Sequence, residues 1–155
     1  MKSKGLAGIG FLEFDEIKEV LENLNCIMST NKKHEAGKKL LLLNRPDEYK
    51  NIIEGLGKIS PELGEYLIEF VYGTIWSRSY EENPIITPKT RALVTISCLA
   101  SLGKEPQLRS HIQGALKIGC KKEEIIEVLL HLAIYAGFPV TINSIKVAQE
   151  VFENE

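Results

Sequence analysis

The sequence has no excess of either charge and no long apolar run. Its 155 residues include 19 Lys and Arg against 21 Asp and Glu, a formal net charge of -2. This balance argues against a broad nucleic-acid-binding or membrane-binding surface. The apolar stretch that follows the basic start is broken by glycines and ends at Glu13, too short for a signal peptide or a membrane span. We therefore expect a cytoplasmic protein without nucleic-acid or membrane partners.

Cysteine is also scarce. The three cysteines, Cys26, Cys98 and Cys120, are odd in number and widely separated, with no C-x-x-C motif and no metal-ligand spacing. Such cysteines suit a reducing compartment and predict neither a disulfide framework nor a metal site. With 44% apolar and 26% charged residues, the chain has the composition of one folded domain whose partner is a small molecule or a protein.

The apolar residues recur at helical intervals, and no run alternates with a period of two for long enough to predict a strand. Caps followed by proline predict two helix starts, at Ser60-Pro61 and Thr87-Pro88. Glycines predict three helix ends: Gly103, Gly119 and Gly137. The predicted helices cover about 14–28, 33–43, 46 onward, 60–76, 87–102, 105–118, 123–136 and 139 onward. We predict an all-α bundle of about seven to eight helices, with its longest loop at 77–84.

The helix predicted at 87–102 is apolar on nearly all sides, which is typical of a central helix. Six motifs then occur in a fixed order along residues 35–153: EAG (35–37), YGTIWSR (72–78), TRALVTI (90–96), HIQGAL (111–116), EEI (123–125) and EVLLHLAIYAGFP (127–139). Together they resemble the carboxymuconolactone decarboxylase family of the AhpD-like superfamily. The resemblance implies an AhpD-like helical bundle that assembles into homotrimers or homohexamers. It assigns residues 32–155 to the family domain and 1–31 to an N-terminal extension with one amphipathic helix.

The resemblance further implies a reaction, the conversion of 4-carboxymuconolactone to 3-oxoadipate enol-lactone without a metal or an organic cofactor. Loss of carbon dioxide leaves an electron pair that spreads onto the lactone carbonyl. The site must therefore bind a small anionic substrate, stabilise a developing oxyanion and return a proton to carbon. Cationic side chains and an acid that works near neutral pH are the groups to look for.

His111 is the main candidate for the proton donor, because imidazole titrates near neutral pH and this position matches the family's histidine. Lys104 and Gln107 fall on the same side of the predicted helix as His111, where they could supply a charge and a hydrogen bond to the substrate. The alternative interpretation of His111 is a helix histidine bonded to a carbonyl or to water.

A second polar group lies on the next helix, where Glu127, His131 and Tyr135 are spaced four residues apart. Glu127 could raise the pKa of His131, and Tyr135 could donate to an oxyanion. The same stripe could instead belong to an interface between subunits, and the spacing leaves both interpretations open.

Two arginines, Arg78 and Arg91, match arginines of the family pattern and could hold a substrate carboxylate through paired hydrogen bonds. Structural arginines that cap helices are an equally ordinary interpretation. Trp76 could form a wall of the pocket or belong to the core. The loop at 78–85 is longer than in the family pattern and Thr74 departs from it, which leaves the substrate open.

Two other functions remain alternatives. The alkylhydroperoxidases of the superfamily use a pair of thiols, and broad annotation of the superfamily records peroxiredoxin activity. Here Lys104 and Gln107 stand at the two thiol positions and only His111 is retained, so disulfide cycling by that route is not expected. The remaining alternative is a non-catalytic oligomer that binds a small acid.

Overall fold

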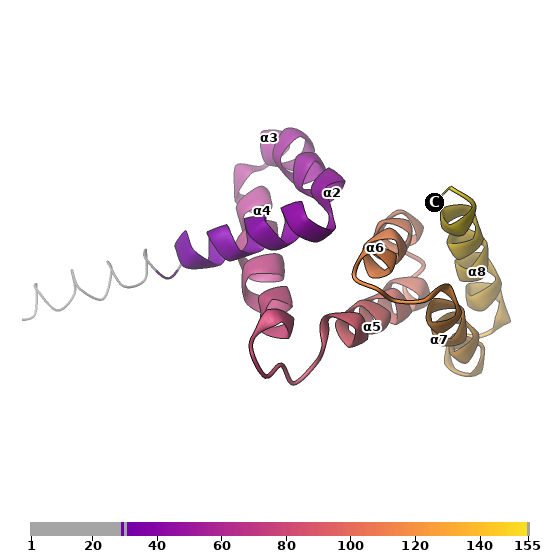
Figure 1. The fold of residues 1–155 in the computed structure, drawn as a ribbon. Helices are drawn as coiled ribbons and strands as arrows, with labels where there is room; N and C mark the ends of the chain where they lie inside the picture. The colour runs from indigo at the N-terminus through magenta and orange to yellow at the C-terminus, as the bar shows by residue number, and fades with distance from the viewer. Residues whose placement is uncertain (1–28, 30, 155) are drawn as a thin grey trace, which may run out of the picture.

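The computed structural model describes residues 29 and 31–154, and in this part of the chain all regular elements are helical (Figure 1). The all-α class is confirmed. The helices cover 31–44, Pro46–Lys50 (α2), Asn51–Leu56 (η1), Gly57–Ile59 (α3), Pro61–Tyr66 (α4), Leu67–Trp76 (η2), Ser77–Tyr80 (η3), Pro88–Ser101 (α5), Glu105–Lys117 (α6), Lys122–Tyr135 (α7) and Phe138–Glu153 (α8). The helix predicted at 14–28 lies outside the described residues, and the domain boundary at 31 stays a prediction.

The predicted helix ends are confirmed by their hydrogen bonds and dihedral angles. The side chain of Ser60 accepts a hydrogen bond from the Leu63 amide at 3.3 Å, and that of Thr87 accepts one from the Thr90 amide at 3.2 Å. The three predicted stop glycines, Gly103, Gly119 and Gly137, have φ of 64°, 90° and 88°. Only glycine adopts this left-handed conformation without strain, so these three positions end their helices as expected.

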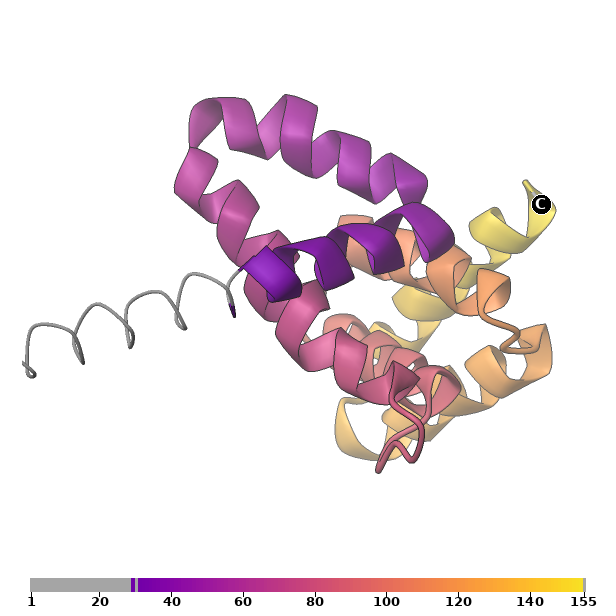
Figure 2. The same cartoon turned by 60° about the vertical axis from the view of Figure 1, so that its left-hand side comes forward.

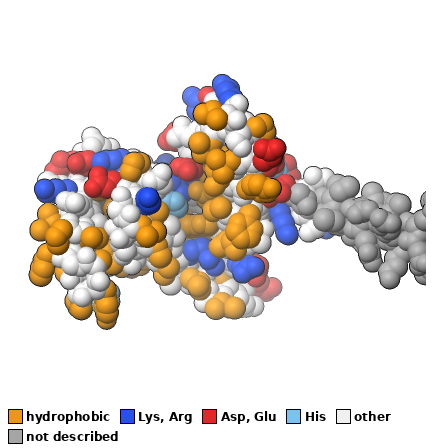
Figure 3. Space-filling model, turned by 180° about the vertical axis from the view of Figure 1, so that it is seen from behind, with side chains coloured by type: hydrophobic (Ala, Val, Ile, Leu, Met, Phe, Trp, Pro, Cys, Tyr) orange, Lys and Arg blue, Asp and Glu red, His pale blue; other side chains and the backbone are white. Residues whose placement is uncertain are grey.

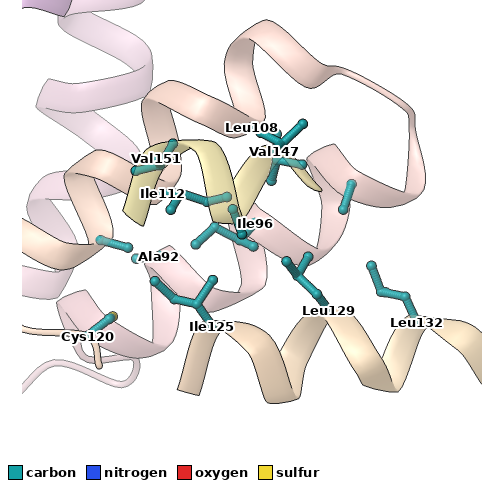
Figure 4. Packing of buried hydrophobic residues seen from close by; sticks show 13 residues of the cluster. Ala92, Ile96, Leu108, Ile112, Cys120, Ile125, Leu129, Leu132, Val147 and Val151 are labelled. Carbon is teal, nitrogen blue, oxygen red and sulfur yellow. The ribbon is translucent and has the colours of Figure 1, made fainter. Parts of the chain in front are cut away.

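The helices form two groups, each with its own buried cluster. The N-terminal group, from helix 31–44 to η2, packs around Leu41, Ile52, Ile68 and Tyr72. The C-terminal group, α5 to α8, packs around a larger cluster that includes Ile96, Leu108, Ile112, Ile125, Leu129 and Val147 (Figure 4). Figures 1 and 2 show the two groups side by side, joined by the segment that leads into α5. Trp76 contacts both clusters, so it lies where the groups meet.

The central position expected for α5 is confirmed in part. α5 packs against α6, α7 and α8 and buries Ala92, Ile96 and Ala100. Val94 and Leu102, however, are 53% and 68% exposed. The helix is apolar on more sides than the C-terminal group covers. In the described part of the chain, no helix is both long and apolar enough to cross a membrane.

Two glycines allow helix 31–44 to cross η2 at backbone contact. A Cβ atom added to Gly37 would lie 2.0 Å from the carbonyl oxygen of Ile68, and one added to Gly73 would lie 2.0 Å from that of Lys33. η2 itself is wound as a π-helix, and the hydroxyl of Thr74 donates to the carbonyl oxygen of Glu69, five residues earlier, at 2.9 Å. The crossing fixes the relative position of helix 31–44 and η2, which both contribute to the pocket described below.

Replacing Gly37 or Gly73 with alanine should therefore destabilise the fold by about 1–3 kcal/mol or more, because backbone atoms would have to move apart. Gly55→Ala is the matched control. It has nothing within 4 Å of its added Cβ, so it should be neutral or slightly stabilising. Urea unfolding of the three variants measures the difference, and equal stability of all three would contradict the close crossing.

Candidate active site

A mostly apolar pocket opens where the two groups meet. About 360 Å³ of empty space lies between its walls when the open solvent at its mouth is counted, but only about 20 Å³ can hold the centre of a water molecule, so the pocket is narrow. Its walls come from helix 31–44, η2, η3 and α6, with a small part from the turn after α6. The lining residues are Leu40, Asn44, Arg45, Tyr72, Trp76, Tyr80, His111, Gly114, Ala115 and Ile118. A concave apolar pocket with a few converging polar groups is the usual form of a small-molecule site.

Arg45 reaches this pocket because the chain bends at its position. Helix 31–44 ends there and Pro46 begins α2, so Arg45 adopts a non-helical conformation with φ -150° and ψ 61°. Its side chain is only 8% exposed and lies along α6 at Gly114. A Cβ on Gly114 would come within 3.1 Å of the Arg45 Cδ. The missing side chain of Gly114 therefore makes room for the arginine stem.

The two terminal nitrogens of Arg45 face different partners. Nη1 donates to the Tyr72 hydroxyl at 2.8 Å and lies 3.0 Å from Nε2 and 3.3 Å from Nδ1 of His111. Nη2 donates to the Glu48 carboxylate at 3.3 Å and to the Ser110 hydroxyl, which itself donates to Glu48 at 3.0 Å. One end of the guanidinium is thus held by Glu48 and Ser110, while the other faces Tyr72 and His111.

Burial and the neighbouring Arg45 charge lower the pKa of His111 to about 3. His111 is therefore neutral near pH 7, and an uncharged imidazole fits the position of the guanidinium close to both of its ring nitrogens. Burial raises the pKa of Tyr72 to about 12, so its hydroxyl stays protonated. The Tyr72 oxygen accepts from Arg45 and its own proton remains available to a ligand. The sequence prediction of a protonated histidine does not fit these surroundings in the absence of an anion.

The low pKa of His111 should make stability depend on pH. The unfolded chain takes up a proton at this histidine below about pH 6.5, whereas the folded chain does so only near pH 3. The free energy of unfolding should therefore fall as the pH falls through this window, by a few kcal/mol in order of magnitude. His111→Gln should remove that part of the decline. Urea unfolding near pH 7 and near pH 4.5 tests it, and equal declines in both proteins would contradict the shift.

Aromatic rings close the pocket around His111. The ring centroid of Trp76 lies 6.0 Å from that of His111 and 6.3 Å from that of Tyr72. Tyr80 stands at the end of η3, and its hydroxyl accepts from the side-chain amide of Asn44 at 2.9 Å. Trp76 lines the pocket and also packs against both buried clusters. Both interpretations of this residue from the sequence therefore apply.

Comparison with known proteins identifies the family of the chain. A model of the carboxymuconolactone decarboxylase family matches residues 61–150, from the start of α4 into α8. The chain belongs to this family. It is 34% identical to 4-carboxymuconolactone decarboxylase of Acinetobacter baylyi over 102 residues, which is 66% of the chain and 72% of that protein. The matched part contains Tyr72, Trp76 and His111, whereas Arg45 and Glu48 lie before it.

Two other relatives are similar over comparable lengths. An uncharacterised 15.0 kDa protein of Paracoccus denitrificans is 29% identical over 105 residues, 66% of the chain and 75% of that protein. Nitrosuccinic acid decarboxylase of Metarhizium robertsii is 31% identical over 90 residues, 58% of the chain and 59% of that protein. Both named decarboxylases act on small carboxylic acids, as their names state.

Other predicted site residues of this carboxymuconolactone decarboxylase family member lie away from the His111 pocket. Lys104 occupies the N-cap position of α6 without a side-chain cap bond and lines a separate hollow with Leu108 and Pro139, and Gln107 is exposed. Lys104 and Gln107 do not share a pocket with His111, although the sequence placed the three on one face. The first turn of α6 is exposed to solvent, whereas His111 faces the pocket.

Arg78 and Arg91 share another hollow, at the long loop, with Glu81, Asn83 and Ile85 among its lining. Arg91 is partly buried there, and its Nε donates to the hydroxyl of Ser79 at 2.6 Å. This bond ties α5 to the end of η3. A substrate role for the two arginines stays a prediction.

The Glu127, His131 and Tyr135 stripe forms as predicted, but on the exposed side of α7. The rings of His131 and Tyr135 lie 5.2 Å apart, all three residues are exposed, and none lines the His111 pocket. The catalytic role of His131 and Glu127 stays a prediction. Within the described residues, it would need a substrate site other than the His111 pocket.

Sequence reasoning missed Arg45, Glu48 and Ser110. The one signal that could have marked Arg45 is the break between the helices predicted at 33–43 and from 46 onward, where the structure bends the chain. Ser110 precedes the predicted histidine directly, and Glu48 lies one turn after Arg45. No spacing within the sequence joins these residues to His111, which is 66 positions from Arg45.

Proposed function

We propose that this protein is a decarboxylase, a carboxy-lyase that acts on a small carboxylated lactone or a related acid. The observation that carries the proposal is the convergence of Arg45, Tyr72 and His111 on one apolar pocket. Two relatives named as decarboxylases, for 4-carboxymuconolactone and for nitrosuccinic acid, support the reaction class. Their different substrates leave the acid itself as part of the proposal.

The pocket supplies the groups that decarboxylation needs. In the reaction, the bond between the carboxylate and the neighbouring carbon breaks, carbon dioxide leaves, and the electron pair passes to a conjugated carbonyl as an enolate. Arg45 Nη1 and the Tyr72 hydroxyl are two donors, 2.8 Å apart, that can bind the carboxylate or the enolate oxygen. The apolar lining excludes water, which strengthens both interactions. The carbanion form is then quenched by a proton.

His111 is the proposed carrier of that proton. It is neutral without an anion, because burial and Arg45 lower its pKa. An anionic substrate would turn Arg45 toward itself and bring a negative charge close to the imidazole, and both changes raise the pKa of His111. As the acid binds, the imidazole can take up a proton from bulk solvent at the pocket mouth and then pass it to the substrate carbon, where the new C–H bond replaces the broken C–C bond. The proposed role is a proton shuttle charged by substrate binding rather than a permanently protonated acid.

The proposal is tested by measuring carbon dioxide release and the loss of lactone ultraviolet absorbance with purified protein. The substrates should be 4-carboxymuconolactone and a panel of β-keto and vinylogous acids. Turnover of at least one acid supports the proposal. If calorimetry shows that acids bind while none is turned over, the protein is a non-catalytic acid-binding member of the family.

A peroxidase function has less support from the site. The two thiol positions hold Lys104 and Gln107. Among the described residues, the cysteines are Cys98, which is exposed, and Cys120, which is buried, and neither lines the His111 pocket. Burial raises the pKa of the Cys120 thiol, which disfavours the reactive thiolate. We therefore keep decarboxylation as the proposed activity.

Self-assembly into a homotrimer or homohexamer in the cytoplasm completes the proposal. Large apolar side chains are exposed along α7 and the start of α8: Leu130, Ile134, Tyr135, Phe138 and Ile142. Hydrophobic side chains also gather on the face shown in Figure 3. Surfaces of this kind are typical of subunit interfaces. A role for His131 and Glu127 could then arise only from that assembly. Sedimentation velocity measures it, and a monomer at micromolar concentration would argue against it.

A further inference from the structure

A cluster of possible metal ligands lies outside the His111 pocket, where helix 31–44 meets α4 and η2. His34 belongs to helix 31–44, Glu65 to α4 and Glu69 to η2. The His34 Nδ1 atom lies 2.9 Å from Glu65 Oε2 and 3.9 Å from Glu69 Oε1. One donor atom from each of the three side chains lies within 4.8 Å of the other two. The residues are 31 and 35 positions apart in sequence, so no local motif announces the cluster.

We propose that His34, Glu65 and Glu69 form a binding site for a divalent transition-metal ion such as Zn²⁺. One imidazole nitrogen and two carboxylate oxygens are a donor set that such ions accept. Donors bound at roughly 2.0–2.2 Å from one ion lie about 3–4 Å from each other, close to the separations of His34 Nδ1 from the two carboxylate oxygens. Only small side-chain rotations are needed to bring the three atoms around an ion, and water would fill the remaining positions.

The charges of the cluster favour a cation. Two carboxylates face a single imidazole, and in the described part of the chain no Lys or Arg forms an ion pair with either of them. A divalent ion balances both negative charges at once. A lysine or arginine beside Glu65 or Glu69 would have satisfied them within the protein and argued for an ordinary ion pair.

The backbone also holds the ligands in place. Gly37 and Gly73 let helix 31–44 and η2 meet at backbone contact, and His34 lies one turn from Gly37 while Glu69 lies one turn from Gly73. Glu65 and Glu69 are four residues apart on a continuous helical segment, so they point to the same side. Ligands on rigid elements form more precise sites than ligands on loops.

Such an ion would tie together the two helices that bear the catalytic pocket. Helix 31–44 ends at Arg45, and η2 carries Tyr72 and Trp76. The ion itself would lie outside that pocket, since none of its three ligands lines it. Its role would be to stabilise the N-terminal group of helices, and this proposal does not depend on the proposed decarboxylase activity.

The test uses the full-length, tag-free protein after treatment with EDTA. Titration calorimetry with ZnCl₂ should show one more zinc bound per chain than in His34→Gln or Glu69→Gln. Addition of about 100 µM ZnCl₂ should raise the Tm of the unaltered protein by a few degrees and leave that of both variants unchanged. Glu82→Gln is the matched control, because it removes an exposed carboxylate outside the cluster and should keep the extra zinc and the Tm shift.

Glu65→Gln provides a variant that is safe for folding, because its side chain is 56% exposed. It should also lose the zinc-dependent rise in Tm while its Tm without zinc stays close to that of the unaltered protein. The proposal is overturned if the unaltered protein binds no zinc, or if His34→Gln and Glu65→Gln bind zinc with the same stoichiometry and Tm shift as the unaltered protein. Either result would leave the cluster as a histidine and glutamate hydrogen bond between two helices.

Discussion

Changing Arg45 to glutamine is expected to reduce kcat/KM for decarboxylation by about 10²- to 10³-fold, the usual cost of removing a charged donor at a developing oxyanion. Glutamine is shorter and uncharged, so it cannot reach Tyr72 and His111 while Glu48 and Ser110 hold its other end. Arg45→Lys should recover only part of the activity, because a single ammonium group cannot face both pairs of partners. Steady-state kinetics on the acid found active in the panel measures both variants.

A control and a second measurement separate catalysis from folding. Arg109→Gln removes another arginine, which pairs with Glu150 on the surface between α6 and α8, and should leave kcat/KM unchanged. Arg45 also lowers the pKa of His111, which must be protonated to donate, so in Arg45→Gln the alkaline limb of the kcat/KM profile should move to higher pH. An Arg45→Gln variant that folds, retains its kcat/KM and shows no such movement would remove Arg45 from the proposed mechanism.

The fold could be predicted because its signals are local. Ser60 and Thr87 cap their helices through side-chain bonds to residues three positions later, and the stop glycine Gly103 adopts its left-handed conformation as expected. Each signal depends on a few neighbouring residues, which the sequence shows directly. The close crossing of helix 31–44 and η2 could not be read this way, because it depends on Gly37 and Gly73, two residues far apart in the chain.

The site could be predicted only in part. The family pattern pointed to His111 and to Trp76, and both line the pocket. Arg45 was missed because its contact with His111 joins the two helix groups, and no periodicity within one helix reveals such a contact. From the sequence we expected Lys104 or Arg91 to supply the positive charge of the pocket. In the structure the cation of the pocket is Arg45, delivered by the bend before Pro46.

The protonation state of His111 is a further property that the sequence does not contain. The ordinary pKa of histidine suggested an acid near neutral pH, but burial between the two helix groups and the charge of Arg45 lower it to about 3. Burial depends on the packing of α6 against residues from η2 and helix 31–44, which only the tertiary structure provides. The same packing separates His111, which is mostly buried, from His131, which is exposed on α7.

His111→Gln is expected to reduce kcat by about 10²- to 10⁴-fold, the range typical of a lost general acid or base. Glutamine keeps a similar size and can still accept from Arg45 Nη1, so the pocket and the binding of the acid should survive. It cannot carry a proton at any relevant pH. The expected signature is therefore a fall in kcat with little change in the dissociation constant of the acid, measured by kinetics and by calorimetry.

Lys117→Gln, on the exposed side of the same helix, is the matched control and should behave as the unaltered protein does. The double variant Arg45→Gln with His111→Gln should be only slightly less active than the less active of the two single variants, because the two side chains act as one unit through their contact. If His111→Gln kept its kcat, the proton would have to come from another donor. Tyr72, which also contacts Arg45, is the remaining candidate, and Tyr72→Phe would then be expected to show the fall in kcat.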